Sequence, residues 1–231
     1  MKNFWGYIKN NRFAIGCTGQ TVYVYDDRGN ELKKFSDITY AYTPMFCPKK
    51  NIFIVKSTVG RLAVYSLDTM QLFKKFRFSK VDGGQDDGFC FSNDGKYFYN
   101  IECHINSLIT YLSIYDTSNF ERIKQLFVND KLQVLSHIEQ DSYSSSLFVL
   151  GFMRGNHGVF DYGFVAELHN EKLINITKLT DEKYDFIRGY KHLELSGFTS
   201  KAKEWSGLKY SGYDLSNIES TTVRLSDYIN L

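Results

Sequence analysis

Five segments of the chain repeat one pattern: a run of alternating apolar residues, a polar turn and a charged amphipathic tail. They begin at Gln20, Arg61, Thr110, Phe164 and Leu208. Alternation with a period of two is typical of half-buried strands. A unit that returns every 40 to 50 residues is typical of an array of small β-sheets. The repeat therefore constrains the architecture of the chain more strongly than it constrains its activity.

The repeats align on the residue that ends each alternating run, which is a tyrosine in four units and a leucine in the fourth. The aligned residues are Tyr25, Tyr65, Tyr115, Leu168 and Tyr213. Two further short apolar runs precede each segment, so that each unit contains four predicted strands joined by turn residues. We therefore expect an all-β fold, a five-bladed β-propeller of four-stranded antiparallel blades in one domain over residues 1–231. The predicted blades cover residues 1–36, 37–78, 87–128, 131–179 and 182–231. No capped stretch with helical periodicity is expected, and the best candidate is a poor one at residues 201–210.

One unit carries a more specific motif. The segment FCFSNDGKYFYNIE begins at Phe89, and the related elements YSLDT and IYDTSN begin at Tyr65 and Ile114. Together they resemble the WD-repeat and YVTN-type β-propeller families, in which an F-S-x-D-G-K-Y turn precedes an inner strand and a "VYD" strand. The Gly-His and Trp-Asp dipeptides of true WD repeats are missing, so the resemblance implies the propeller architecture and no particular subfamily.

Charge and composition exclude several classes of partner. The 28 basic and 26 acidic residues give a formal charge of +2, too little to attract nucleic acid or anionic lipid. Two of the lysine clusters, Lys33-Lys34 and Lys74-Lys75, fall in the charged tails, where lysines protect the edge of a sheet. No apolar run approaches the roughly 20 residues that span a bilayer, and no secretory signal is recognisable. We expect a cytoplasmic monomer with no cofactor, no metal, and neither nucleic acid nor membrane as partner.

The four cysteines form no C-x-x-C pair, which argues against zinc and disulfides. We expect Cys17, Cys47, Cys90 and Cys103 to be buried free thiols.

Longer loops distinguish the last three units. In a propeller blade, the links between strands two and three lie at the same rim as the links to the next blade. In units three to five these links are long, and binding sites are common on such loops. The predicted partner-binding residues are Asp82, Asp86, Asp87, His104, Asn106, Arg154, His157, Arg188 and Trp205.

Several of these residues also fit a purely structural role. Trp205 could fill the seam between the last and first blades. The aspartates of residues 82–87 lack the D-x-D-x-D-G spacing of a calcium loop, which favours a solvated loop. His104 and His157 could approach each other, but no third metal ligand is evident.

Three functions remain open. The first is a non-catalytic protein-protein interaction module that binds through the rim loops of blades three to five, an expectation that rests on fold analogy. The second is a carbohydrate-binding, lectin-like propeller, although its pockets should then repeat from blade to blade. The third is a glycoside-active enzyme with two carboxylates ~5 to 10 Å apart, for which Asp87, Glu102 and Glu139 are candidates. Because no catalytic motif is present, we expect no enzyme and assign no catalytic residue.

Overall fold

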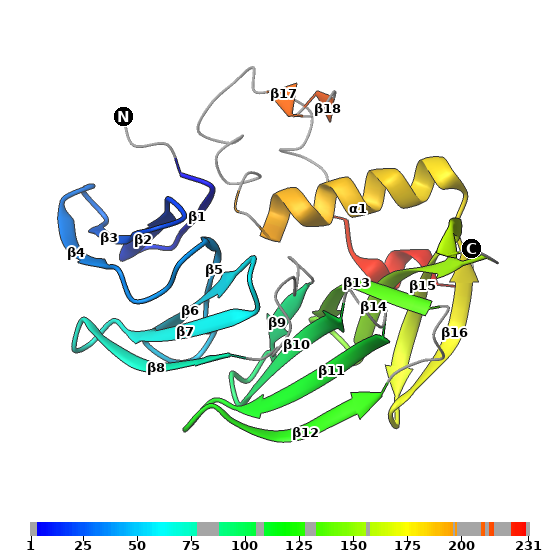
Figure 1. The fold of residues 1–231 in the computed structure, drawn as a ribbon, viewed down its shortest axis with the longest axis horizontal. Helices are drawn as coiled ribbons and strands as arrows, with labels where there is room; N and C mark the ends of the chain where they lie inside the picture. Colours follow the sequence, from blue (N-terminus) through cyan, green and yellow to red (C-terminus); the bar gives the residue numbers. More distant parts are fainter. Residues whose placement is uncertain are drawn as a thin grey trace. The chain divides into compact units, whose positions relative to one another are not determined.

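The structure, a computed structural model, describes most of the chain (Figure 1). The described residues are 4–77, 88–104, 109–127, 133–155, 158–195, 197, 209–210, 213–214 and 223–229, with the side chains of residues 103, 104, 209, 210, 213 and 214 excepted. They divide into two compact units. Unit 1 comprises Met1–Phe46, Asn51–Phe76 and Tyr190–Val223, and unit 2 comprises Cys47–Lys50, Arg77–Gly189 and Arg224–Leu231. Each unit is described separately.

Unit 1 contains two four-stranded antiparallel sheets, each with its strands in chain order. The first consists of β1 (Gly6–Lys9), β2 (Phe13–Cys17), β3 (Val22–Asp26) and β4 (Glu31–Phe35). The second consists of β5 (Ala41–Phe46), β6 (Ile52–Ser57), β7 (Arg61–Ser66) and β8 (Gln71–Arg77). The first strands, β1 and β5, pack against each other. Their close approach depends on Gly6, because a Cβ there would lie 1.8 Å from the carbonyl oxygen of Tyr42.

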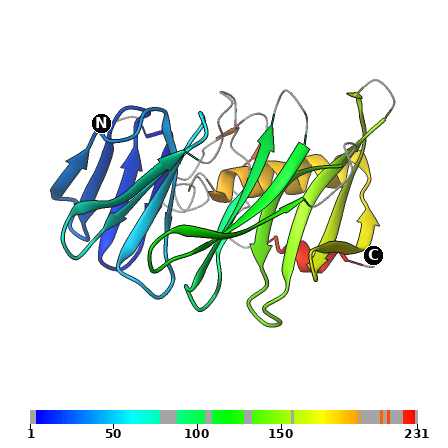
Figure 2. The same ribbon diagram turned by 60° about the horizontal axis from the view of Figure 1, so that its bottom comes forward.

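Unit 2 repeats this arrangement. One sheet consists of β9 (Phe89–Phe91), β10 (Tyr97–His104), β11 (Ile109–Asp116) and β12 (Glu121–Phe127). The other consists of β13 (Gln133–Gln140), β14 (Leu147–Arg154), β15 (Phe160–His169) and β16 (Lys172–Lys178). The strands of both sheets follow one another without crossing, in green and yellow in Figure 2. The first strands, β9 and β13, again pack against each other, and the second strand β10 also contacts β13.

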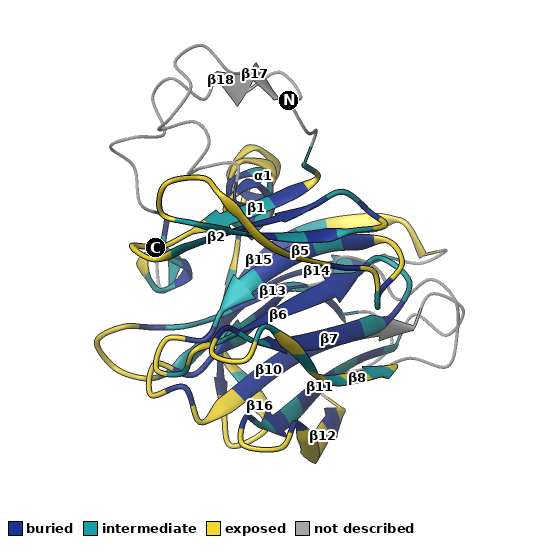
Figure 3. Ribbon diagram, turned by 90° about the vertical axis from the view of Figure 1, so that its left-hand side faces the viewer, coloured by how far each residue is buried: buried dark blue, intermediate teal, exposed yellow. Residues whose placement is uncertain are grey.

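Burial changes from the inner to the outer strands of each sheet (Figure 3). Strands β6 and β7 are buried on both faces, whereas β8 alternates between exposed and half-buried residues. Each unit has its own apolar core: Phe53 and Tyr65 stack in unit 1 with ring centroids 5.0 Å apart, and Ile101 and Leu135 belong to the core of unit 2. Burial of each such side chain contributes about 1.5–3 kcal/mol. The pairing of inner strands and the burial of these side chains together fix the sheets.

The predicted fifth blade is wrong. Four four-stranded sheets are present in the described residues, and they lie within residues 1–36, 37–78, 87–128 and 131–179. In place of the expected fifth blade, Asp181–Leu195 forms the helix α1, and among the described residues that follow, β17 (Lys209–Tyr210) and β18 (Tyr213–Asp214) form a short two-stranded sheet. The described part of the chain is therefore β-propeller-like, with four four-stranded sheets and a helix, and the prediction that no capped helix is present is also wrong.

Residues at the two ends of α1 explain where the helix begins and ends. Thr180 caps its start, since the Thr180 hydroxyl accepts a hydrogen bond from the amide of Lys183 at 3.4 Å. The acidic Asp181 and Glu182 fall in the first turn, where they interact favourably with the helix dipole. Gly197 follows the helix with a φ of +76°, and its amide donates to the carbonyl of Glu194 at 3.0 Å. A short 3-10 helix, η3 (Leu225–Tyr228), lies near the C-terminus.

Cys17, Cys47 and Cys90 are free thiols, as expected; Cys17 and Cys47 are buried, Cys90 is partly buried, and the side chain of Cys103 lies outside the described residues. Burial raises the pKa of all three. They are therefore protonated at neutral pH and unreactive as nucleophiles.

Candidate functional site

Only three of the nine predicted partner-binding residues fall in the described part of the chain. Asp82, Asp86, Asp87, Asn106, His157 and Trp205 lie outside it. The backbone of His104 ends β10, opposite Ile109. Arg154 ends β14 and is buried, and Arg188 is an exposed residue of α1. The assignment of these residues to a binding site stays a prediction.

A pocket of about 540 Å³ lies in unit 1. It is formed by the link between β2 and β3, by the link between β4 and β5, and by the residue before β1. These are links of the kind expected at the binding rim, but they belong to the first two sheets, whose loops are short and were therefore not favoured as a site. We call it the Trp5 pocket; its lining residues are Trp5, Thr18, Gly19, Gln20, Thr21, Thr39 and Tyr40.

Backbone hydrogen bonds join the two loops of the Trp5 pocket. The amide of Gly19 donates to the carbonyl of Ala41 at 3.1 Å, and the amide of Ala41 donates to the carbonyl of Gly19 at 2.8 Å. The Thr18 amide donates to the Thr21 carbonyl at 3.0 Å, which closes the first loop. On the second loop, the Ser57 hydroxyl donates to the carbonyl of Thr39 at 2.8 Å. The pocket is therefore held by main-chain bonds before any ligand binds.

The backbone and the ring of Trp5 are both held by neighbouring residues. Its amide donates to the carbonyl of Cys17 at 2.7 Å, and its ring lies 6.3 Å from the ring of Tyr42. Next to it is Gly19, with a φ of +85°, where a Cβ would lie 2.8 Å from the Trp5 ring. The Trp5 side chain is nevertheless 45% exposed. A large ring that is both supported and accessible is available for contact with a ligand.

Tyr40 provides the second ring of the Trp5 pocket. It is 55% exposed and has a φ of +54°, a backbone conformation that costs a non-glycine residue of order 1 kcal/mol or more. The amide of Thr58 donates to its carbonyl at 3.2 Å, which helps to hold this conformation.

The chemistry of the Trp5 pocket follows from its lining. Two aromatic rings supply apolar contact area, and threonine hydroxyls with the Gln20 amide supply donors and acceptors. None of the lining residues carries a charge. Such a surface favours a group with an apolar face and polar edges, beside the Arg61 guanidinium that donates to the Thr39 hydroxyl at 3.1 Å. The sequence signal that could have identified it is a tryptophan next to the first strand, facing two threonine-containing turns.

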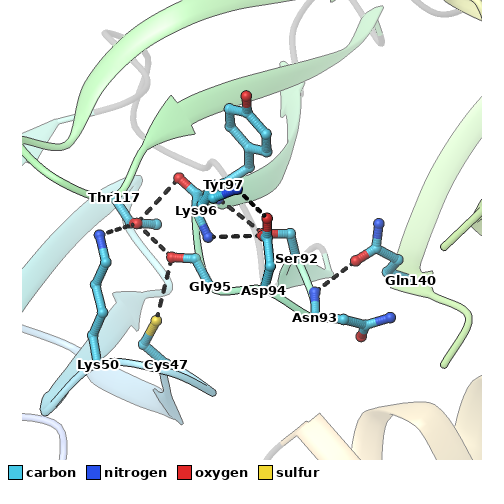
Figure 4. Close-up of polar contacts among 10 residues, drawn as sticks. All are labelled: Cys47, Lys50, Ser92, Asn93, Asp94, Gly95, Lys96, Tyr97, Thr117 and Gln140. Carbon is cyan, nitrogen blue, oxygen red and sulfur yellow. Dashed lines mark hydrogen bonds and ion pairs between the residues drawn. The ribbon is translucent and has the colours of Figure 1, made fainter.

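The turn that carries the WD-like motif has a structural role in unit 2 (Figure 4). The Ser92 hydroxyl and the Lys96 amide both donate to Asp94, at 2.7 and 3.0 Å. These hydrogen bonds, that of Ser92 first, lower the pKa of Asp94 to about 2. Thr117 links the turn to its neighbours, since its hydroxyl donates to the Gly95 carbonyl at 2.5 Å and accepts from Lys50 at 2.6 Å.

The two described carboxylates considered for glycoside chemistry, Glu102 and Glu139, accept hydrogen bonds from other residues of unit 2. Glu102 is 1% exposed and accepts hydrogen bonds from Asn100, Tyr115 and Gln125 at 3.4, 3.1 and 3.1 Å. Burial, with the nearby Glu102, raises the pKa of Tyr115. Glu139 accepts a short hydrogen bond from the Leu225 amide of η3. Asp87 lies outside the described residues.

Metal ligands and membrane-spanning segments are not evident in the described structure. Among the described residues, no group of three or more His, Cys, Asp or Glu could hold a metal ion. No helix in that part of the chain is long and apolar enough to cross a membrane.

Comparison with known proteins gives a distant relative and a fold. No family model matches the chain. Topless-related protein 3 of Arabidopsis thaliana, a WD-repeat protein, is 26% identical over 157 residues, which are 66% of this chain and 14% of that protein. The chain thus spans about one seventh of the length of this relative. The solved hydrazine synthase of Kuenenia stuttgartiensis matches with a TM-score of 0.60 and 12% identity over 78% of this chain and 51% of that one, a likeness of fold alone. Sheets and comparisons together show a β-propeller-like chain with a distant WD-repeat relative.

Proposed function

We propose that the chain is a non-catalytic protein-protein interaction module, and that the Trp5 pocket receives a side chain of its protein partner. The observation that carries this proposal is the pair of exposed rings, Trp5 and Tyr40, beside loops joined by the Gly19–Ala41 hydrogen bonds. Trp and Tyr are among the residues that most often dominate the energy of protein interfaces. A pocket that is ordered beforehand also avoids part of the entropic cost of binding.

The similarity to a WD-repeat protein supports a protein-interaction function in general terms, as an analogy of fold. The end of β14 in unit 2, where Arg154 lies, is proposed as a separate contact region. Because Glu102 is enclosed by its own hydrogen-bond donors, it has a structural role in this proposal and not a catalytic one.

The test is affinity capture with the immobilised full chain. The captured partner is identified, produced alone and titrated against the wild type and Trp5→Ala. We expect Trp5→Ala to weaken binding by about tenfold or more, the effect of losing one hot-spot side chain. Tyr143→Ala is the matched control, because Tyr143 is an aromatic residue of unit 2 that is 83% exposed and lies outside the Trp5 pocket. Equal affinity of the wild type and Trp5→Ala would reject the pocket as the binding site.

A carbohydrate ligand is the second candidate, because sugars too combine apolar faces with hydroxyl groups and need no charge in the site. The neutral lining of the Trp5 pocket favours it specifically. A glycan array separates the two candidates: glycan binding that Trp5→Ala abolishes supports the lectin-like function. No glycan bound by the wild type, together with a captured protein lost in Trp5→Ala, supports the protein module.

A further inference from the structure

A buried arginine in unit 2 has unused hydrogen-bonding capacity. Arg154, the last residue of β14, is 9% exposed. Its Nη1 is buried and has no hydrogen-bond partner among the described residues. None of the ion pairs in the described part of the chain includes Arg154. Because an unpaired buried charge is costly, a position of this kind calls for an oppositely charged ligand.

The contact that Arg154 makes with an aromatic ring leaves the buried Nη1 without a hydrogen-bond acceptor. Its guanidinium lies over the ring of Phe152, 5.8 Å from the ring centroid. A ring face attracts a cation, but it does not replace the paired N–H···O hydrogen bonds that a carboxylate accepts from arginine. Phe152 therefore orients the guanidinium of Arg154 but leaves its Nη1 without a hydrogen-bond acceptor.

Rigid elements surround this position. The Phe160 ring lies 5.8 Å from that of Phe152, and Tyr184 of α1 lies 5.3 Å from Phe160. Tyr184 is held against β15, because a Cβ on Gly163 would lie 2.1 Å from its ring. Arg188, one helical turn after Tyr184, is close enough to oppose the rise in the pKa of Tyr184 that burial causes. Asp185 of the same helix acts on this pKa in the opposite sense, so the charges of Arg188 and Asp185 offset each other near the rings.

Access to the cluster comes from exposed residues at the start of β15. The Gly155 amide donates to the Val159 carbonyl at 2.8 Å, so the base of the turn after β14 is fixed. Val159 and Phe160 are 65% and 41% exposed. Asp161 lies in the irregularity between β14 and β15 and forms no ion pair with Arg154 among the described residues. The exposed surface beside Arg154 therefore combines the apolar Val159 and Phe160 with Asp161, and no described side chain there forms an ion pair with Arg154.

We propose that Arg154 forms a carboxylate-binding site, and that its ligand is the Asp or Glu side chain of an acidic, partly apolar segment of a protein partner. One carboxylate neutralises the one buried guanidinium, whereas a phosphate dianion would leave excess negative charge there. Apolar residues beside the carboxylate would contact Val159 and Phe160. The protein source of the carboxylate rests on the proposed function, but the anion site itself does not depend on the Trp5 pocket.

The test uses the full chain with isotope-labelled arginine and sodium acetate as the carboxylate probe. Side-chain NMR signals of the arginines are followed during titration, with sodium chloride as the control for ionic strength. We expect the Arg154 signal to shift saturably, with half-saturation in the millimolar range typical of a single charge-assisted contact. Arg12 is an internal control, because it also lies over a ring, that of Phe13, at 5.1 Å but is exposed. Arg224, which is already paired with Asp227 at 2.8 Å, is a second one.

Each outcome decides the proposal. An Arg154 signal that moves no more than that of Arg12 overturns it, and so does tighter binding of sodium phosphate than of acetate. A capped peptide with a central glutamate should compete with acetate, and its glutamine counterpart should not; equal competition rejects a protein carboxylate as ligand. Arg154→Lys assigns the signal and should keep weaker acetate binding. Trp5→Ala should leave the response of Arg154 to acetate intact, which separates this site from the Trp5 pocket. This comparison holds even if Arg154→Gln, which removes the charge, fails to fold.

Discussion

Gly19 and Ala41 exchange a pair of backbone hydrogen bonds of 3.1 and 2.8 Å, although Gly19 lies in the link between β2 and β3 of the first sheet and Ala41 begins β5 of the second. This isolated antiparallel bridge carries Thr18 and Gln20 on one side and Tyr40 on the other. The two sheets are therefore joined at the floor of the Trp5 pocket. Changes in the packing of β1 and β5 should reach the pocket directly.

Gly19→Ala should destabilise the chain and displace the Trp5 ring. The left-handed φ of +85° costs alanine about 1 kcal/mol, and the added Cβ would lie 2.8 Å from the ring. Gly29→Ala is the matched control, since Gly29 has a φ of +84° and an added Cβ would meet no atom within 4 Å. In a Trp205→Phe background, Trp5 fluorescence should change in Gly19→Ala alone, and urea unfolding should show the larger loss there. Identical emission spectra in the two variants would contradict this account.

Gly163→Ala should loosen the contact between β15 and α1. Its Cβ would lie 2.1 Å from the ring of Tyr184, so that either the helix or the ring must move. We expect a loss of about 1–3 kcal/mol in the free energy of unfolding, the usual cost of overpacking. Gly155→Ala, whose nearest neighbour would be 3.8 Å away, should cost clearly less. Chemical denaturation followed by far-UV circular dichroism measures both, and equal losses would show that α1 is not held at this point.

Asp94 should contribute stability that disappears in acid. Its pKa falls from 3.8 to about 2 in the folded chain, so the carboxylate form is favoured by folding. The contribution is therefore complete above the unfolded pKa and is lost as the pH falls from about 4 towards 2. Melting temperatures of the wild type and Asp94→Asn should differ most above pH ~5 and converge at low pH. Carbon NMR of the carboxyl group provides a direct check: Ser92→Ala should raise the pKa of Asp94, and a wild-type value near the unfolded one would refute the role of the turn.

Thr180→Ala should shorten or weaken α1 at its start. It removes the hydroxyl that accepts a hydrogen bond from the Lys183 amide, and losses of this type are about 1 kcal/mol. Thr180→Ser keeps the acceptor and should remain close to the wild type. Urea titrations of the three proteins make the comparison, and a serine variant as unstable as the alanine variant would argue against capping.

The first four sheets could be predicted because their repeats follow the period-two pattern throughout. Tyr25, Tyr65, Tyr115 and Leu168 align in the sequence, and each is the last residue but one of the third strand of its sheet. The hairpin turns are equally local: the side chain of Asn10 accepts hydrogen bonds from the amides of Arg12 and Phe13. Such features depend on neighbouring residues, so short segments of sequence are enough to predict them.

The prediction of a fifth blade is wrong because two periodicities fit the same residues. Tyr184 and Phe186 alternate as in a strand, but the buried apolar residues are Tyr184, Ile187, Tyr190 and Leu193, which have helical spacing. Thr180 and Gly197, which mark the two ends of the helix, decide between them. The sequence offers one local signal for the Trp5 pocket, a tryptophan next to the first strand, but the pocket itself depends on the bridge between Gly19 and Ala41, residues with no pattern in common.

The outermost strands have a consequence for the way a partner can bind. Lys33 and Lys34 in β4, and Lys74 and Lys75 in β8, lie on strands at the end of their sheets. Charged side chains along such an edge oppose the addition of a further strand from another molecule. A partner that extends these sheets by β-augmentation is thereby disfavoured. A partner is then recognised by side chains and loops. Binding specificity should therefore change when single residues at the ends of strands are substituted, without any change in the sheets.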